Sequence, residues 1–137
     1  MKLIVKHFFD ACHMLPDSCH LVSKGCRNLH GHTYAVIVEA EGENERAGMI
    51  VDFKAIKDVV DQFDHTSILK RGPHTESLFE IVGGNKPFVF LEAEPTAENI
   101  AREIKHRINK AFPDLKNLVV KVCEGYKGQE RGSWIEV

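Results

Sequence analysis

Alternating apolar and polar positions predict four β-strands, two near each end of the chain. The clearest is HTYAVIVEAEG, where Tyr34, Val36 and Val38 occupy every second position. Alternate residues of a strand point to the same face of its sheet, so these three side chains are expected to face a core. The stretch KLIVKHFFDA is rich in the β-branched and aromatic residues that strands favour. The four predicted strands are residues 2–11, 32–42, 117–125 and 132–137.

Two segments between these strands have the spacing of amphipathic helices. The first covers 53–63, and Asp52 is placed to cap its first turn. The second covers 95–112, where Thr96 is the expected N-cap and Glu98 favours the positive end of the helix. Helical spacing predicts these buried positions: Phe53, Ile56, Val60 and Phe63 in the first helix, and Ile100, Ile104 and Ile108 in the second.

The connection 66–94 has no clear periodicity. It contains Gly72-Pro73, Gly83-Gly84 and Pro87, so most of it is expected to be loop. The segment PFVFLE (87–92) reads as a short edge strand that begins at a proline.

The order strand, strand, helix, helix, strand, strand predicts one α+β domain over residues 1–137. Short links within each strand pair favour a four-stranded antiparallel sheet, with the last two strands as a hairpin and both helices on one face. A sheet of four strands leaves its edges open. An oligomer formed through the sheets would cover those edges.

Composition narrows the class of protein. The formal net charge is −2, and no Lys/Arg run dominates, which argues against a nucleic-acid partner. No apolar run reaches the ~18 residues of a membrane span, and the first residues carry charges where a secretory signal needs an apolar core. We therefore expect a cytoplasmic protein whose four cysteines are reduced.

The segment CRNLHGH (26–32) carries the strongest chemical signal. His30 and His32 are two positions apart at the start of a predicted strand, so both imidazoles face the same side. His13 ends the first strand, and antiparallel pairing would bring it beside them. Three imidazoles with one open position are typical of catalytic zinc sites, so we predict that these histidines bind Zn²⁺.

Cys26 has two interpretations from the residues alone. It is either a fourth ligand that closes a structural site, or a nucleophile or base beside the metal, where a nearby cation would favour its thiolate. The pairs Cys12-His13 and Cys19-His20 also resemble metal sites. We interpret Cys12 and Cys19 as small apolar side chains instead.

Two further candidates are acidic. Asp64 precedes His65, an arrangement that serves proton transfer when the carboxylate orients the imidazole, although a basic residue also suits the end of a helix. Glu124 ends a mostly apolar strand. Its carboxylate would bind an amidine-like group through two hydrogen bonds, or else simply face solvent.

The order of five motifs resembles the 6-pyruvoyltetrahydropterin synthase superfamily. Their spacing, with three residues between the cysteine and HGH, is most similar to its bacterial and archaeal branch, the 6-carboxy-5,6,7,8-tetrahydropterin synthases of the queuosine pathway. The motifs are F-x-A-x-H (9–13), C-x3-H-G-H (26–32), Asp64-His65, P-T-A-E-N (95–99) and V-x-V-x-E ending at Glu124.

This resemblance implies a role for each matched residue. His13, His30 and His32 would hold zinc, and Cys26 would be a base that removes a carbon-bound proton. Asp64 and His65 would relay a second proton. Glu124, with help from Thr96, would bind the pterin ring of 7,8-dihydroneopterin triphosphate. Lys24 and Arg27 are hypotheses for the triphosphate, with solvated loop charges as the alternative.

The resemblance also implies an assembly and a product. The family fold is the tunnelling fold, in which subunits join their sheets into a barrel, commonly as a homohexamer of two trimers with sites between subunits. The expected reaction releases acetaldehyde and triphosphate. The alternatives are the pyruvoyl-forming reaction and a non-catalytic zinc module. The chain departs from the family at Gly125, where threonine is usual, and in the long connection 66–94.

Overall fold

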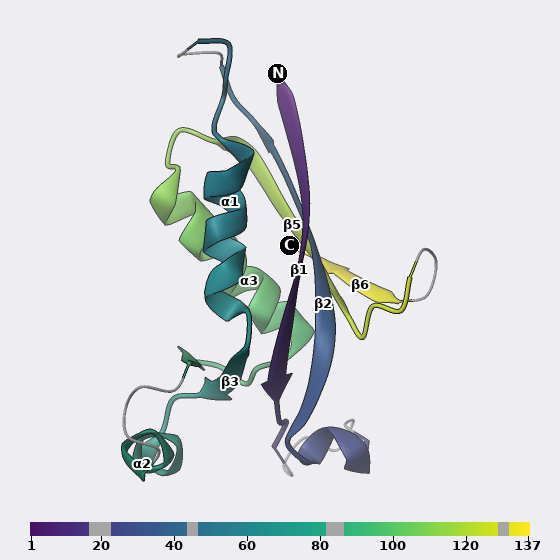
Figure 1. Cartoon of the computed structure of the whole chain (residues 1–137), viewed down its shortest axis with the longest axis vertical. Coiled ribbons are helices and arrows are strands. Elements are labelled where there is room, and N and C mark those ends of the chain that lie inside the picture. The colour runs from purple at the N-terminus through teal and green to yellow at the C-terminus, as the bar shows by residue number, and fades with distance from the viewer. Residues whose placement is uncertain (17–22, 44–46, 82–86, 129–131) are drawn as a thin grey trace.

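The computed structural model describes residues 1–16, 23–43, 47–81, 87–128 and 132–137. A mixed sheet with strand order β4-β3-β1-β2-β5-β6 forms one layer, and α1 and α3 lie side by side on one of its faces (Figure 1). The strands are β1 Lys2–His13, β2 His30–Glu41, β3 Thr66–Lys70, β4 Phe88–Leu91, β5 Lys116–Glu124 and β6 Ser133–Glu136. The α-helices are α1 Phe53–Val60, α2 Pro73–Ile81 and α3 Ala97–Ala111, and short 3-10 turns cover Lys24–Arg27 and Asp61–Phe63.

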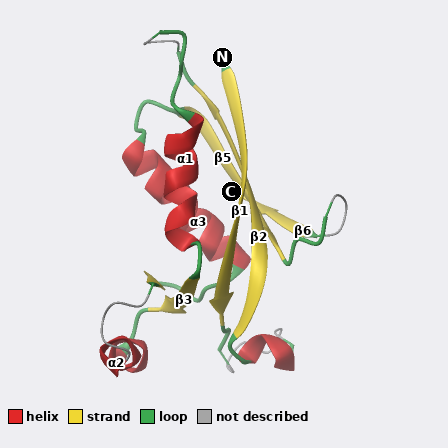
Figure 2. Ribbon diagram, viewed as in Figure 1, coloured by secondary structure: helices red, strands yellow, loops and turns green. Residues whose placement is uncertain are grey.

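The α+β class and the antiparallel order β1-β2-β5-β6 agree with the sequence prediction. The predicted number of strands was too small, because the described residues form six strands. β3 runs parallel to β1, and β4 runs parallel to β3. Figure 2 shows β3 as a short strand beside the end of β1 that lies far from the N-terminus. Parallel neighbours are joined by crossovers and not by hairpins, so no local turn marks β3. The predicted edge strand in 87–92 is present as β4.

Helix α2 was also missed, since 66–94 was expected to be mostly loop. It begins at Pro73, and proline is well suited to the first position of a helix because its missing N–H has no partner there in any case. The two predicted helices are present, and their N-caps are as expected. Asp52 accepts from the Lys54 amide, and Thr96 accepts from the Asn99 amide.

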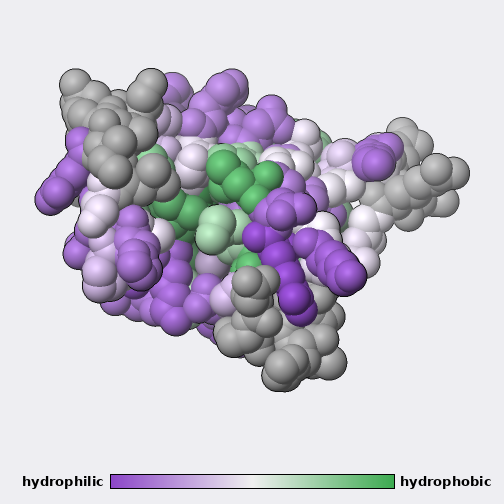
Figure 3. All heavy atoms as spheres, turned by 90° about the horizontal axis from the view of Figure 1, so that it is seen from below, coloured by the Kyte–Doolittle hydropathy of each residue, from purple (hydrophilic) through white to green (hydrophobic). Residues whose placement is uncertain are grey.

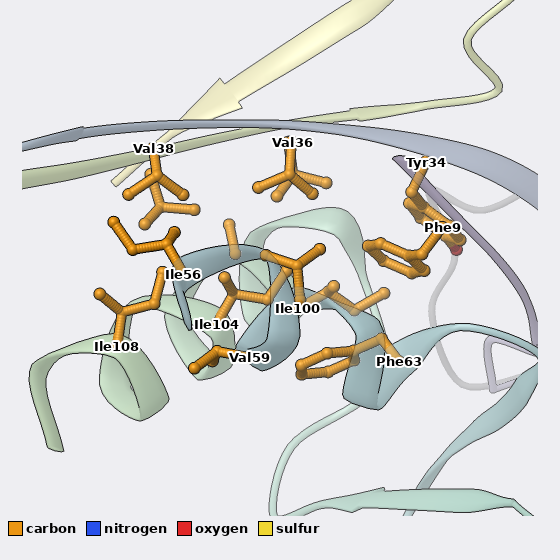
Figure 4. Close-up of a cluster of buried hydrophobic side chains, with 14 of the residues drawn as sticks. Phe9, Tyr34, Val36, Val38, Ile56, Val59, Phe63, Ile100, Ile104 and Ile108 are labelled. Atoms are coloured by element: carbon orange, nitrogen blue, oxygen red, sulfur yellow. The ribbon is translucent and has the colours of Figure 1, made fainter. Parts of the chain in front are cut away.

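The core lies between the sheet and helices α1 and α3 (Figure 4). α3 buries Ile100, Ile104 and Ile108 as predicted. In the first predicted helix, Ile56, Val60 and Phe63 are buried as predicted. The prediction for Phe53 was wrong, because this residue is 56% exposed, and Val59 is buried in addition. None of the described helices is long and apolar enough to cross a membrane.

Candidate metal centre and active site

The register of β1 and β2 brings the three histidines together at one end of the sheet. His13 pairs with His30, and His32 pairs with Ala11 two residues further along. Strand alternation directs all three imidazoles to the face that α1 and α3 cover. Figure 3 views the molecule toward this end, where hydrophobic side chains gather near the middle and hydrophilic ones surround them.

Backbone carbonyls fix the orientation of two of the rings. The Nδ1 atoms of His13 and His30 donate to the carbonyls of Pro95 and Asn28, at 2.6 and 2.7 Å. A carbonyl only accepts, so in the neutral rings the proton is on Nδ1 and a lone pair is on Nε2. These two Nε2 atoms lie 3.1 Å apart. Two lone pairs this close cannot hydrogen-bond to each other, whereas a cation bound by both would satisfy them.

Glu124 completes a group of four donors. The β2–β5 register sets Glu124 opposite Tyr34. Its Oε1 lies 3.0 Å from His32 Nε2 and 3.7 Å from His13 Nε2. One ligand atom from each of the four residues falls within 4.8 Å of all the others. From the sequence we expected Glu124 to bind a pterin or to face solvent. Its position among the histidines was therefore not predicted.

His32 provides the clearest sign that the group fits a cation. Its Nε2 is buried and makes no hydrogen bond of acceptable geometry within the described residues, despite the nearby carboxylate. Burial lowers the pKa of His32, and the charges of His13 and His30 act in the same direction against the opposing effect of Glu124. The neutral imidazole that this favours is the form that binds metals. Three imidazoles and a carboxylate suit Zn²⁺ among other divalent metals.

Two stacked aromatic rings pack against the histidine cluster on its core side. Tyr34 is fully buried, and the edges of the His13 and His32 rings meet it at centroid distances of 6.0 and 5.7 Å. Phe9 stacks on Tyr34 at 4.7 Å. Burial, reinforced by the charge of Glu124, raises the pKa of Tyr34 well above its usual range. The floor of the site is therefore buried and uncharged.

Cys26 lies outside the four-donor group. It is in the 3-10 turn Lys24–Arg27, where its Sγ is 3.1 Å from the Ser23 hydroxyl. Its carbonyl accepts from the amide of Leu15 at 2.9 Å. That contact ties the turn to the chain just after His13. Lys24 is exposed and Arg27 is half-buried on the same turn.

Asp64 and His65 contact each other but not the four-donor group. Asp64 Oδ2 lies 2.7 Å from His65 Nδ1, and Asp64 Oδ1 accepts from the Asp10 amide at 2.8 Å. The Asp10 amide, and then His65, hold the pKa of Asp64 below its ordinary value. The His65 side chain is 82% exposed.

An open cavity of about 510 Å³ adjoins this pair. Its lining includes Asp10, Cys12, His32, Thr33, His65 and Ser67. Alternation places Asp10, Cys12 and Thr33 on the sheet face opposite the three histidines. His32 is therefore the member of the four-donor group that reaches the cavity beside His65, and no hydrogen bond or ion pair in the described part of the chain joins the Asp64-His65 pair to that group.

Thr96 lies next to Pro95, whose carbonyl contacts the candidate metal centre. Its hydroxyl oxygen accepts from the Asn99 amide at 3.4 Å and caps α3, while the preceding carbonyl of Pro95 holds His13.

Cys12 does not join the four-donor group either. Its Sγ contacts the Ser67 hydroxyl at 3.1 Å. The pair Cys19-His20 lies outside the described residues.

Comparison with known proteins identifies relatives along nearly the whole chain. A family model for 6-pyruvoyl tetrahydropterin synthase matches residues 2–130. A 6-carboxy-5,6,7,8-tetrahydropterin synthase of Rickettsia bellii is 38% identical over 114 residues, 78% of this chain and 77% of that protein. The enzyme of the same name from Haemophilus influenzae is 33% identical over 120 residues, covering 79% and 82%.

Solved structures share the fold at lower identity. The 6-pyruvoyltetrahydropterin synthase of Plasmodium vivax is 17% identical with a TM-score of 0.60, over 100% of this chain and 97% of that one. The Caenorhabditis elegans enzyme is 19% identical with a TM-score of 0.58, over 100% and 95%.

Proposed function

The chain belongs to the 6-pyruvoyl tetrahydropterin synthase family, and we propose that it is a zinc-dependent lyase acting on 7,8-dihydroneopterin triphosphate. The products would be 6-carboxy-5,6,7,8-tetrahydropterin, acetaldehyde and triphosphate, as a step of queuosine biosynthesis. The cluster of His13, His30 and His32 carries this proposal. Its Nε2 lone pairs converge without hydrogen-bond partners that would satisfy them.

The three histidines would hold the zinc ion. When bound, zinc supplies a Lewis acid that polarises the hydroxyls of the substrate's side chain. The chain's own part is to keep the rings in place. The carbonyls of Pro95 and Asn28 hold the Nδ1 protons, which leaves each Nε2 available as a ligand.

Cys26 would remove a carbon-bound proton from the side chain next to the pterin ring. Its sulfur is within hydrogen-bond distance of the Ser23 hydroxyl, and a hydroxyl donor stabilises a thiolate. Its exclusion from the four-donor group supports a role beside the metal.

Asp64 and His65 would handle the second proton. The Asp64 carboxylate accepts from the ring N–H of His65 and orients the exposed imidazole as an acid or base. Because this pair makes no direct contact with the four-donor group of its own chain, we propose that it serves a site completed by another subunit. That arrangement fits a homohexamer built as a dimer of trimers, with the sheets joined into a barrel.

The remaining polar residues would bind the substrate. The two oxygens of Glu124 match the 2-amino group and N3–H of a pterin. Thr96 retains a hydroxyl proton to donate to the ring, since its oxygen accepts in the helix cap. Lys24 and Arg27, on the turn that carries Cys26, would contact the triphosphate.

The runner-up function is formation of 6-pyruvoyltetrahydropterin, the activity for which the matching family model is named. Both reactions release triphosphate, but only the carboxy-forming reaction releases acetaldehyde. A non-catalytic module remains the third alternative, with Cys26 and the histidines forming a closed zinc site.

One assay separates these functions. Zinc-loaded protein is incubated with 7,8-dihydroneopterin triphosphate, acetaldehyde is quantified, and pterin products are identified by mass. We expect acetaldehyde from the wild type and a loss of at least ~100-fold in turnover for Cys26→Ala, with its zinc content unchanged. Cys123→Ala is the matched control, because this buried thiol lies on the opposite sheet face.

Three other results would overturn the proposal. A pyruvoyl product without acetaldehyde would establish the runner-up. Loss of zinc and of folding in Cys26→Ala would show a structural site. Full turnover in Cys26→Ala would remove this residue from the mechanism.

A further inference from the structure

Among the described residues, the Glu124 carboxylate has no lysine or arginine partner. Its side chain is 29% exposed, and within the described residues its carboxylate makes ion contacts only with His13 and His32. A partly buried carboxylate is costly without a positive charge nearby. Its Oε1 lies 3.0 Å from His32 Nε2 and 3.7 Å from His13 Nε2, so a cation bound by these rings would also contact the Glu124 carboxylate and supply that charge.

A ligand set of four differs from a set of three in one functional respect. Catalytic zinc sites keep one position for water or substrate, whereas sites with four protein ligands are closed. With Glu124 bound beside the three histidines, a four-coordinate metal would have no free position for the hydroxyls of a substrate. Zinc can add a fifth ligand, but a site that stays four-coordinate admits the substrate only when one of the four ligands leaves.

The hydrogen bonds of the group indicate which ligand leaves. His13 and His30 are held through Nδ1 by the carbonyls of Pro95 and Asn28, and His32 packs against the fully buried Tyr34 ring. The Glu124 carboxylate has no hydrogen bond to any other described residue. It ends β5 and is followed by Gly125 at a φ of +69°. A Cβ at Gly125 would lie 3.7 Å from His32 Nδ1, so the glycine keeps the space beside that ring free of a side chain.

We propose that Glu124 is a metal ligand in the substrate-free protein and exchanges the metal for the pterin ring when substrate binds. This inference rests on the proposed function, in which the same carboxylate binds the 2-amino and N3–H edge. Recognition of the ring would thereby open the metal position that the substrate's hydroxyls require. A compound with the hydroxylated side chain but no such donor edge would leave the site closed.

The test measures the metal centre directly, using the full-length protein loaded with Co²⁺. Metal affinity is measured by competition with a chromophoric chelator, and the visible cobalt spectrum reports the ligand set. We expect Glu124→Gln to weaken metal binding at least about tenfold, the lower range for loss of groups that support a site, and to change the spectrum without any substrate. Glu136→Gln, on the exposed end of β6, should leave both unchanged.

The exchange itself is tested with 7,8-dihydroneopterin. Its addition should change the wild-type cobalt spectrum, whereas glycerol, which has hydroxyls but no pterin ring, should not. Glu124→Asp keeps the negative charge on a shorter side chain and should also weaken metal binding. It replaces Glu124→Gln in the experiment if the glutamine variant does not fold. Unchanged affinity and spectrum in the folded Glu124 variant would overturn the inference. An unchanged wild-type spectrum with bound pterin would overturn the exchange.

These outcomes are independent of turnover. If the wild type releases acetaldehyde while Glu124→Gln binds cobalt normally, the proposed function stands and the ligand role fails. If cobalt binding weakens in Glu124→Gln but the wild type forms no product, the ligand role stands and the proposed function fails.

Discussion

Binding of zinc should stabilise the protein by an amount that can be worked out. His13, His30 and His32 on β1 and β2 and Glu124 on β5 converge only in the folded chain, so a metal bound there favours the native state. At a free metal concentration of 100 times Kd, the gain is about 2.7 kcal/mol. Unfolding entropy near 2.1 cal/mol/K per residue gives roughly 0.29 kcal/mol/K for 137 residues. The expected rise in Tm is therefore about 9 °C.

Differential scanning calorimetry of chelated and zinc-loaded protein measures this shift, with circular dichroism to verify folding. The chelated protein should remain folded, because the core between the sheet and α1 and α3 does not involve the cluster. His30→Ala removes one ligand and should lose most of the shift. An equal shift in His30→Ala would refute the assigned site. Unfolding of the wild type on chelation would instead indicate a structural zinc module.

Two further predictions concern stability. Phe9→Ala should lower the free energy of unfolding by about 3–5 kcal/mol, because this buried ring stacks on Tyr34 and contacts Phe63. Urea titrations measure this loss, with Phe8→Ala as the control because Phe8 is 49% exposed. An equally small loss in both variants would contradict the prediction. The Asp10 amide and His65 lower the pKa of Asp64 in the folded state. The ionised Asp64 carboxylate should therefore stabilise the protein at pH values above 3.8, the ordinary pKa of the group. This stabilisation should disappear as the pH falls through the lower pKa of the folded state. Urea titrations of wild type and Asp64→Asn from about pH 7 to about pH 3 should therefore converge at acidic pH, and a pH-independent difference would contradict the shift.

Local patterns predicted the parts of the fold that depend on neighbouring residues. The apolar stripe of Ile100, Ile104 and Ile108 identified the face of α3 that packs on the sheet. Alternation in β2 identified Tyr34, Val36 and Val38 as core residues. Parallel pairing of β3 was not predictable in this way, because its partner strands are reached through helices and not through a turn.

The same division applies to the candidate site. The sequence by itself determined that His30 and His32 share one face, since residues two apart on a strand do so, and it indicated that His13 would meet them where the strands pair. Only the tertiary structure decided that Glu124 joins this group and that Asp64 and His65 do not. The position of Glu124 follows from the register between β2 and β5, and that of Asp64 from its hydrogen bond with the Asp10 amide. Both depend on contacts between residues far apart in the chain, which strand periodicity and motif spacing do not encode.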